Sequence, residues 1–323
     1  MKKEVLRVFH PEIEPILREK SQGIDRRHAL RFSLFITLYF LGAALACWSA
    51  EALPKSRLWW TLLLPAALLA AASLHGISLF THEAVHGTLC RQRHWNAVLG
   101  AFCAMPVLQN FSAYRLLHLR HHEHLGLEGD PDHYPNYTRW SWMVFLMNWG
   151  RLLIGYPAYL CAIPILGWKH GKRADRFGIV AEVLLACCFI YLLFRMPFPW
   201  LWYGWLFPML LINFFVNIRG MSQHTLLEEH HPDPIRGTRT IETNRVTTFF
   251  MCNENYHLEH HLYPGVPWFH LPRLHRLLKG ELTRRGAPFI PSYFAFVREF
   301  ITGSFQRSPL GKYQREEARS ARR

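Results

Sequence analysis

The sequence alternates long apolar blocks with polar, largely basic stretches. Four blocks, residues 32–50, 58–81, 178–194 and 200–218, contain no charged residue except Glu182. An α-helix rises about 1.5 Å per residue and the hydrocarbon core of a bilayer is about 30 Å thick, so each block is close to the length needed to cross it. Short loops that contain proline join the blocks in pairs. The pattern predicts an all-α, polytopic membrane protein with four transmembrane helices arranged as two hairpins.

Histidines recur at helical spacing just beyond these blocks. HEAVH places two imidazoles at i and i+4, and both HLRHH and HLEHH place three at i, i+3 and i+4. Residues at these offsets share one face of a helix. A single histidine on a helix is an ordinary feature, but three groups with matched spacing predict a metal site. The eight histidines are His82, His86, His118, His121, His122, His257, His260 and His261.

Two further apolar stretches are predicted not to cross the membrane. Residues 95–114 contain Pro106, and residues 141–168 are interrupted by Arg151 and two prolines. If either stretch crossed, groups of histidines on its two sides would face opposite compartments. We therefore expect residues 95–114 to be re-entrant or interfacial and residues 141–168 to lie on the membrane surface. This arrangement gathers the histidine groups in a helical cap on one side.

The charge distribution predicts which side that is. The formal net charge is +14, yet only Lys55, Arg57 and Arg195 lie in the two predicted outer loops. Because Lys and Arg favour cytoplasmic loops, we expect the histidine groups and both termini to be cytoplasmic. No groove-reading motif accompanies the positive charge, so nucleic acid is not an expected partner.

The boundaries of the predicted domain follow from the same blocks. Residues 1–31 are expected to form a cytoplasmic N-terminal segment, residues 32–305 a single membrane domain, and residues 306–323 a disordered basic tail.

The number of imidazoles predicts more than one metal. Eight exceed the three or four protein ligands that one zinc ion takes, and His224, just beyond the fourth block, is the best ninth ligand. Imidazole suits iron, zinc, copper or nickel, so ligand type alone does not select the metal. Ligand orientation depends on hydrogen-bond acceptors behind the rings. The candidate acceptors are Glu83, Glu123, Glu259, Asp130, Asp132 and Asn253, of which Asn253 is also a candidate to approach the metal through water.

The histidine groups and their surroundings resemble a known superfamily. HEAVH, HLRHH and NYHLEHHLYPGVPWFHLPRLH, in this order between paired apolar blocks, are similar to the three histidine boxes of integral-membrane fatty acid desaturases and hydroxylases, over roughly residues 30–280. The third box looks most like that of bacterial fatty acid desaturases. The resemblance implies two non-haem irons held by the eight box histidines, with His224 following by position, and O2 as co-substrate. It also implies a lipid or fatty acyl substrate and a location in the inner or plasma membrane of a bacterium.

Several activities remain open. Desaturation of a fatty acyl chain is the reaction we favour, while hydroxylation, ketolation and oxidative decarboxylation use the same boxes. HEAVH also matches the HExxH motif of zinc proteases, with Glu83 as general base, but this leaves both three-histidine groups without a role. A non-enzymatic metal carrier would need polar residues along the spans.

The electrons for such a reaction must come from another protein. The sequence contains no HPGG cytochrome signature, no glycine-rich dinucleotide fingerprint and no clustered cysteines. We expect an external donor of ferredoxin, rubredoxin or cytochrome type. A basic cytoplasmic face that includes Arg273 and Arg276 would attract an acidic partner.

Overall fold

The computed structural model describes residues 13–16, 24–53, 58–227 and 233–306. The predicted tail after residue 306 and most of the predicted N-terminal segment lie outside these residues. Apart from two short strands, the regular elements of the described residues are helices, as expected for an all-α protein.

The first two predicted spans form the expected hairpin. Helix α2 (Arg26–Ala52) packs along α3 (Leu58–Val85). Gly42 allows the close approach, because a Cβ there would meet the backbone of Ala66 and Ala70 at 2.7 Å. Helix α3 continues four residues past the predicted block, so its last turn carries His82. The first histidine box therefore stands on a rigid element.

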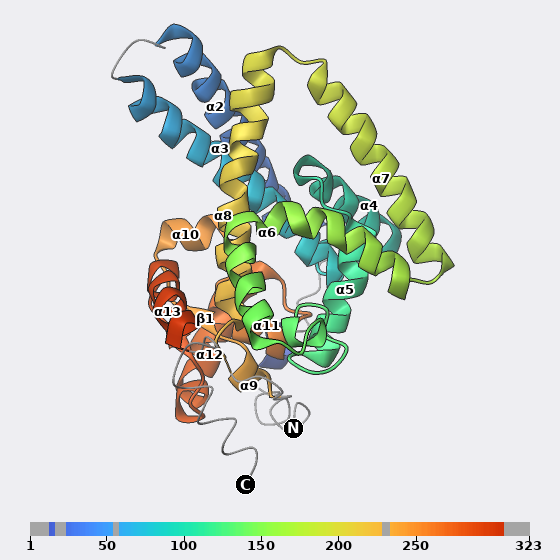
Figure 1. Ribbon diagram of the computed structural model, residues 1–323, viewed down its shortest axis with the longest axis vertical. Coiled ribbons are helices and arrows are strands. Elements are labelled where there is room, and N and C mark those ends of the chain that lie inside the picture. The colour runs from blue at the N-terminus through green and yellow to red at the C-terminus, as the bar shows by residue number, and fades with distance from the viewer. Residues whose placement is uncertain (1–12, 17–23, 54–57, 228–232, 307–323) are drawn as a thin grey trace.

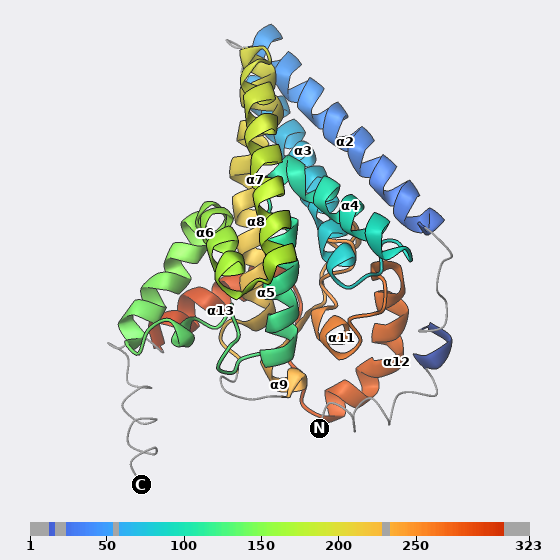
Figure 2. The ribbon, with the colours of Figure 1, turned by 90° about the vertical axis from the view of Figure 1, so that its right-hand side faces the viewer.

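The segment predicted to be re-entrant is two helices with a sharp bend between them. Helix α4 (Arg93–Ala104) and the short η1 (Met105–Val107) meet α5 (Phe111–His124) at 104°. Figure 2 shows α4 rising and α5 returning beside it. Asn110 caps α5 by accepting from the Ala113 N–H at 3.0 Å. The second box thus returns to the end of the molecule where α3 ends.

The second predicted hairpin is splayed rather than packed. Helix α7 (Arg173–Phe194) contacts α5 and α6 instead of α8, and Figure 1 shows α7 and α8 diverging from their shared turn. Glu182 of α7 joins it to the start of α5, because its carboxylate accepts hydrogen bonds from the Ser112 N–H at 2.9 Å and the Ser112 hydroxyl at 2.6 Å. The one charged residue within the predicted spans therefore finds its partner on α5.

Helix α6 (Ser141–His170) contains the stretch predicted to lie on the surface. It is long and apolar enough to span, so the described residues contain five candidate spans instead of the four predicted. However, Ile154 has non-helical dihedral angles, and the two halves of α6 run in different directions (Figure 1). Asn213 provides hydrogen-bond partners for the backbone groups at the break: it donates to the Leu153 carbonyl at 2.8 Å and accepts from the Tyr156 N–H at 3.2 Å. Buried polar backbone is tolerated at this depth only with such partners.

The last predicted span is one continuous helix. The π-helix η3 (Trp200–Leu206) leads into α8 (Phe207–His224), which runs six residues past the predicted block. His224 is therefore the last residue of a long helix, and this helix also supplies the two asparagines, Asn213 and Asn217, that contact the break in α6.

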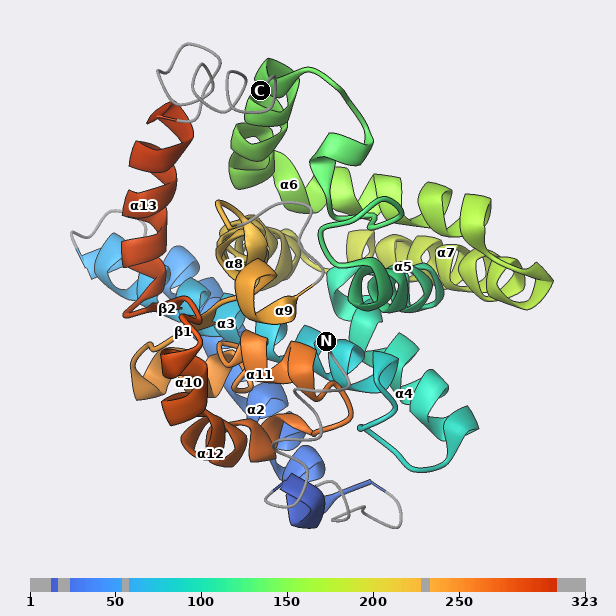
Figure 3. The same ribbon diagram turned by 90° about the horizontal axis from the view of Figure 1, so that it is seen from below.

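The remaining elements form a cap at the end where α3, α5 and α8 finish. Helix α11 carries the third box and lies between α5 and α12 (Figures 2 and 3). Amphipathic α12 buries Leu271, Leu274, Leu278 and Leu282 in one cluster with Leu258 and Leu262 of α11. Strands β1 and β2 pair in parallel. The cap elements are η2 (Tyr134–Asn136), α9 (Pro234–Gly237), β1 (Thr240–Ile241), α10 (Arg245–Phe250), α11 (His257–Leu262), η4 (Trp268–His270), α12 (Leu271–Arg284), β2 (Phe289–Ile290) and α13 (Tyr293–Gln306).

Candidate metal centre

All nine histidines proposed as ligands come together at the junction of the helices and the cap. Five side chains form one cluster, in which one ring nitrogen from each lies within 4.8 Å of the others. The Nε2 atom of His118 lies 3.1 Å from that of His86 and 3.0 Å from that of His122. The Nε2 atoms of His122 and His260 are 3.2 Å apart. The members of this first cluster are His82, His86, His118, His122 and His260.

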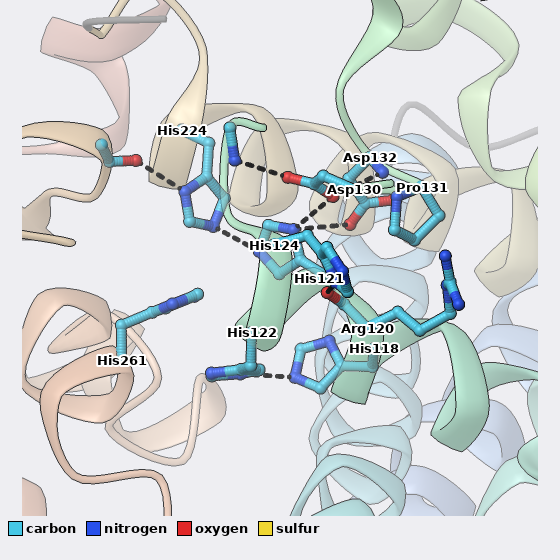
Figure 4. Close-up of polar contacts among 12 residues, drawn as sticks. His118, Arg120, His121, His122, His124, Asp130, Pro131, Asp132, His224 and His261 are labelled. Atoms are coloured by element: carbon cyan, nitrogen blue, oxygen red, sulfur yellow. Dashed lines mark hydrogen bonds and ion pairs between the residues drawn. The ribbon is translucent and has the colours of Figure 1, made fainter. Parts of the chain in front are cut away.

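The other four imidazoles form a second cluster beside the first. Ring nitrogens of His121, His224 and His261 lie within 4.8 Å of one another. His257 completes the group, because its Nε2 atom is 3.1 Å from the Nε2 atoms of both His224 and His261. The rings of His122 and His261 stack with centroids 4.1 Å apart, so the two clusters share a boundary. Figure 4 shows the imidazole of His121 directed toward that of His224, and the imidazole of His118 directed toward that of His122.

The spacing of the nitrogens fits metal coordination. Two imidazoles bound at about 2.1 Å and about 90° to one ion have their nitrogens about 3.0 Å apart. The Nδ1–H of His121 donates to Asp130 at 2.9 Å, and that of His224 donates to the Gly237 carbonyl at 2.9 Å. These bonds leave the Nε2 lone pairs of two neighbouring rings facing each other at 3.2 Å. Such an arrangement is repulsive unless a cation lies between the lone pairs, so the residues fit a pair of metal ions.

The acid behind the second box is one of the predicted acceptors. Asp130 follows α5 in a turn, and its carboxylate also accepts from the Gly126 N–H at 2.8 Å and the Asp132 N–H at 2.9 Å. Figure 4 shows the turn holding the carboxylate against His121. Asp132 lies farther away, with its carboxylate 3.9 Å from the Nδ1 atom of His121. Asp130 is therefore the acid that orients this imidazole.

The other predicted acceptors contact different groups. Glu83 accepts from the Thr88 hydroxyl at 2.7 Å and from the Trp268 N–H at 3.3 Å. Glu259 accepts from the Thr240 hydroxyl at 2.5 Å and contacts His275 at 2.6 Å, so it joins α11 to β1 and α12 within the cap. Asn253 donates to the Trp268 carbonyl at 2.9 Å, and this bond directs its amide toward the chain that follows the third box. Glu123 is exposed and approaches only His124.

Sequence reasoning missed Glu254, the acid that joins the two clusters. One carboxylate oxygen lies 3.2 Å from the Nδ1 atom of His82 and the other lies 3.5 Å from the Nδ1 atom of His257. Glu254 is fully buried, at 1% exposure. It lies three residues before His257, in the turn that leads into α11. A carboxylate at that offset from a histidine group was the available signal.

Burial sets the protonation of the third box. Desolvation lowers the pKa values of His257, His260 and His261 well below the ordinary value of histidine. Burial alone would raise the pKa of Glu254, but the nearby His260 and His257 imidazoles lower it overall. The third box therefore presents neutral imidazoles, the form that binds metal, next to an ionised carboxylate.

An apolar cavity of about 490 Å³ opens on both clusters. Its walls include the imidazoles of His82, His118, His121, His224 and His257. The second half of α6 supplies an apolar wall that consists of Ala158, Tyr159, Ala162, Ile163 and Leu166. A cavity of this size and composition suits a small or chain-like organic molecule held next to the metals.

A polytopic bundle of apolar helices with nine clustered imidazoles at one end defines a membrane protein with a histidine-rich centre able to bind metal. The sequence matches the family model "Fatty acid desaturase" over residues 58–293, so the chain belongs to the fatty acid desaturase family. It is an oxidoreductase of this family, whose members generally depend on iron.

The chain is similar to relatives with different products. It is 27% identical over 291 residues to dihydrorhizobitoxine desaturase of Bradyrhizobium elkanii, covering 79% of this chain and 75% of the relative. It is 28% identical to a beta-carotene ketolase of Paracoccus sp. (strain PC1), covering 74% of this chain and 91% of the relative. A sphingolipid delta(4)-desaturase of Drosophila melanogaster is 24% identical, covering 70% of this chain and 68% of the relative. Both desaturation and ketolation therefore occur among proteins of comparable similarity.

Proposed function

We propose that the protein is an O2-dependent, di-iron membrane enzyme that desaturates a fatty acyl chain with electrons from an external redox protein. The observation that carries the proposal is the pair of adjacent imidazole clusters at the wall of an apolar cavity. The five-member cluster exceeds the four ligands of a zinc site, which favours a metal of higher coordination number. The proposed location is the inner or plasma membrane of a bacterium, with the centre on the cytoplasmic side.

Different residues of the chain would hold the metals and position the substrate in such a reaction. His82, His86, His118, His122 and His260 would hold one iron, and His121, His224, His257 and His261 the other. When bound, the iron pair supplies the reduction of O2 and the oxidising power to attack an unactivated C–H bond. Because imidazole ligands carry no charge, they would leave the positive charge of the two ions uncompensated. The apolar wall of α6 positions the chain and excludes bulk water from the centre.

The reaction class can be tested by metal content together with product analysis. The purified enzyme should contain two irons per chain, and with a reducing system, membrane lipids and O2 it should yield a product that has lost two hydrogens. One zinc per chain would instead indicate the protease interpretation, and variable loading would indicate a carrier. A product that gains one oxygen and keeps its other hydrogens would replace desaturation with hydroxylation.

Ketolation is the second candidate, because relatives of similar identity are named as beta-carotene ketolases. The same mass-spectrometric assay separates it from desaturation, since a ketone gains one oxygen and loses two hydrogens. An alkene shorter by one carbon would identify oxidative decarboxylation.

A further inference from the structure

Two arginines line the apolar cavity without a carboxylate partner. Arg151 belongs to the first half of α6 and Arg219 to the last part of α8, and both contribute to the cavity wall. Within the described part of the chain, no carboxylate oxygen lies within 4.0 Å of either guanidinium group. The Nε atom of Arg219 is buried and has no hydrogen-bond partner there. An arginine left in this state inside an apolar site is costly, which marks it as a functional group.

The acids near the cavity contact histidines. Asp132, the one carboxylate on the cavity wall, lies 3.9 Å from the Nδ1 atom of His121. Glu254 lies between His82 and His257. Neither acid forms an ion pair with Arg151 or Arg219 among the described residues. Arg219 lies near enough to Glu254 to help lower the pKa of that acid, but neither guanidinium group has a direct carboxylate partner there, so a ligand anion can pair with both.

The fold makes room for the head of Arg151. A Cβ added to Gly220 would lie 2.7 Å from Nη2 of Arg151, so the guanidinium group rests on bare backbone next to Arg219 in the chain. Its ring neighbour is Tyr134, with the guanidinium carbon 5.8 Å from the ring centroid. Because position 220 has no side chain, there is room for the guanidinium group of Arg151 beside Arg219 on the cavity wall.

Arg151 also lies at the boundary between apolar and polar space. A second cavity of about 1210 Å³ adjoins the first and shares Arg151, Asp132, Tyr134 and His224 with it. Its wall also carries Arg139, Arg236 and Arg285, of which Arg285 is paired with Glu281 at 2.8 Å. A ligand with an apolar chain in the first cavity would therefore meet the guanidinium group of Arg151 where its polar end emerges.

We propose that Arg151 and Arg219 bind an anionic group of the substrate, a carboxylate or a phosphate, while its apolar part occupies the 490 Å³ cavity beside the imidazole clusters. Guanidinium groups bind both oxyanions through paired N–H···O bonds. This inference rests on the proposed function and narrows its substrate class to anionic amphiphiles, because an uncharged hydrocarbon such as a carotene would leave both arginines unpaired.

The test is equilibrium binding by the full-length, detergent-solubilised protein without reductant. The ligands share one chain length and differ only at the end: a fatty acid, its methyl ester and the matching alkyl phosphate. The wild type should bind at least one anionic ligand about tenfold or more tightly than the ester. A tighter alkyl phosphate assigns the anion to a lipid phosphate, and a tighter fatty acid assigns it to a free carboxylate. Equal binding of all three ligands would overturn the proposal.

Two variants locate the anion site. Arg151→Gln removes the charge, and Gly220→Ala displaces the guanidinium group while replacing a helical glycine by a better helix former. Both should lose the anion preference and keep the affinity for the ester. Arg273→Gln, on the exposed face of α12, should keep the preference. If the preference survives in both cavity variants, the proposed site is wrong.

Failure of the proposed function has a different signature. Binding is measured without O2 chemistry, so an anion preference combined with absent oxidation would refute the enzymatic proposal and retain the ligand site. Oxidation of the methyl ester as efficiently as of the anions, with no binding preference, would refute the ligand site and retain the enzyme.

Discussion

At the scale of single residues, the histidines depend on the groups behind their Nδ1 atoms. Asp130 and the Gly237 carbonyl orient two ligands of the second cluster, and Glu254 contacts one imidazole of each cluster. The hydrogen bonds to Asp130 and Gly237 select the tautomer whose Nε2 lone pair is free for metal, and the Glu254 carboxylate lies at ion-pair distance from two further Nδ1 atoms. Glu254 is the one described acid that bridges the clusters, so its loss should affect both.

Substitution of Glu254 should weaken metal binding without moving a ligand. Glu254→Gln keeps the size of the side chain but replaces one acceptor oxygen by a donor, so one Nδ1–H loses its partner. Loss of such a supporting group typically lowers metal affinity about 10- to 100-fold. Iron retained during dialysis against graded chelator concentrations, measured by elemental analysis, provides the comparison.

Glu123→Gln is the matched control, because Glu123 directly follows the second box but its side chain is 74% exposed. It should retain iron as the wild type does. If Glu254→Gln also does so, Glu254 has no part in holding the ligands.

At the scale of elements, the second box depends on how α5 begins. The first N–H groups of a helix lack partners inside that helix. Asn110 satisfies one of them, and Glu182 of α7 accepts from the N–H and hydroxyl groups of Ser112. Asn110 also donates to the Ile179 carbonyl at 3.0 Å, so α5 and α7 are joined by two side chains.

Replacement of Glu182 by leucine should destabilise the protein. The Ser112 N–H and hydroxyl would remain buried without acceptors, at an expected loss of about 1–3 kcal/mol. Glu182→Gln should lose less, because its amide oxygen still accepts. Thermal unfolding in detergent measures the difference, with Val183→Leu on an exposed part of α7 as the control. Equal melting temperatures for Glu182→Leu and the control would show that this contact does not hold α5.

At the scale of the whole molecule, α11, which carries the third box, and α12 lie at one end, and the turn between α7 and η3 lies at the other (Figure 1). The exposed side of α12 carries Arg273 and Arg276, whereas Arg195 stands in the opposite turn. If the cap is cytoplasmic, as we propose, this basic surface is where an acidic electron donor would dock.

Charge reversal on α12 should slow electron delivery. The double substitution of Arg273 and Arg276 by glutamate should lower the rate of reduction by an acidic donor roughly tenfold at low ionic strength, with less difference at high salt. Arg195→Glu, at the other end, should leave the rate unchanged. Stopped-flow reduction measured across a salt series is the assay. A rate and a salt dependence equal to those of wild type would exclude docking on this face.

The sequence by itself determined which segments are apolar helices and which histidines share a helix face. Both are local properties, since hydropathy and the offsets i, i+3 and i+4 are read directly along the chain. The bent α4–α5 segment was also predictable, because a continuous span would have separated His82 from His118. His224 was less evident, because it has no partner at helical spacing.

Only the tertiary structure decided how these local elements meet. It divides the nine imidazoles into groups of five and four. The order of the boxes along the sequence does not indicate this division, because the second and third boxes each contribute to both clusters. It splays the second predicted hairpin, in which Glu182 finds its partner on α5 instead of α8. It also places Glu254, Arg151 and Arg219 at the centre and its cavity. Contacts between side chains distant in sequence depend on how helices pack, and no pattern along the chain records that geometry.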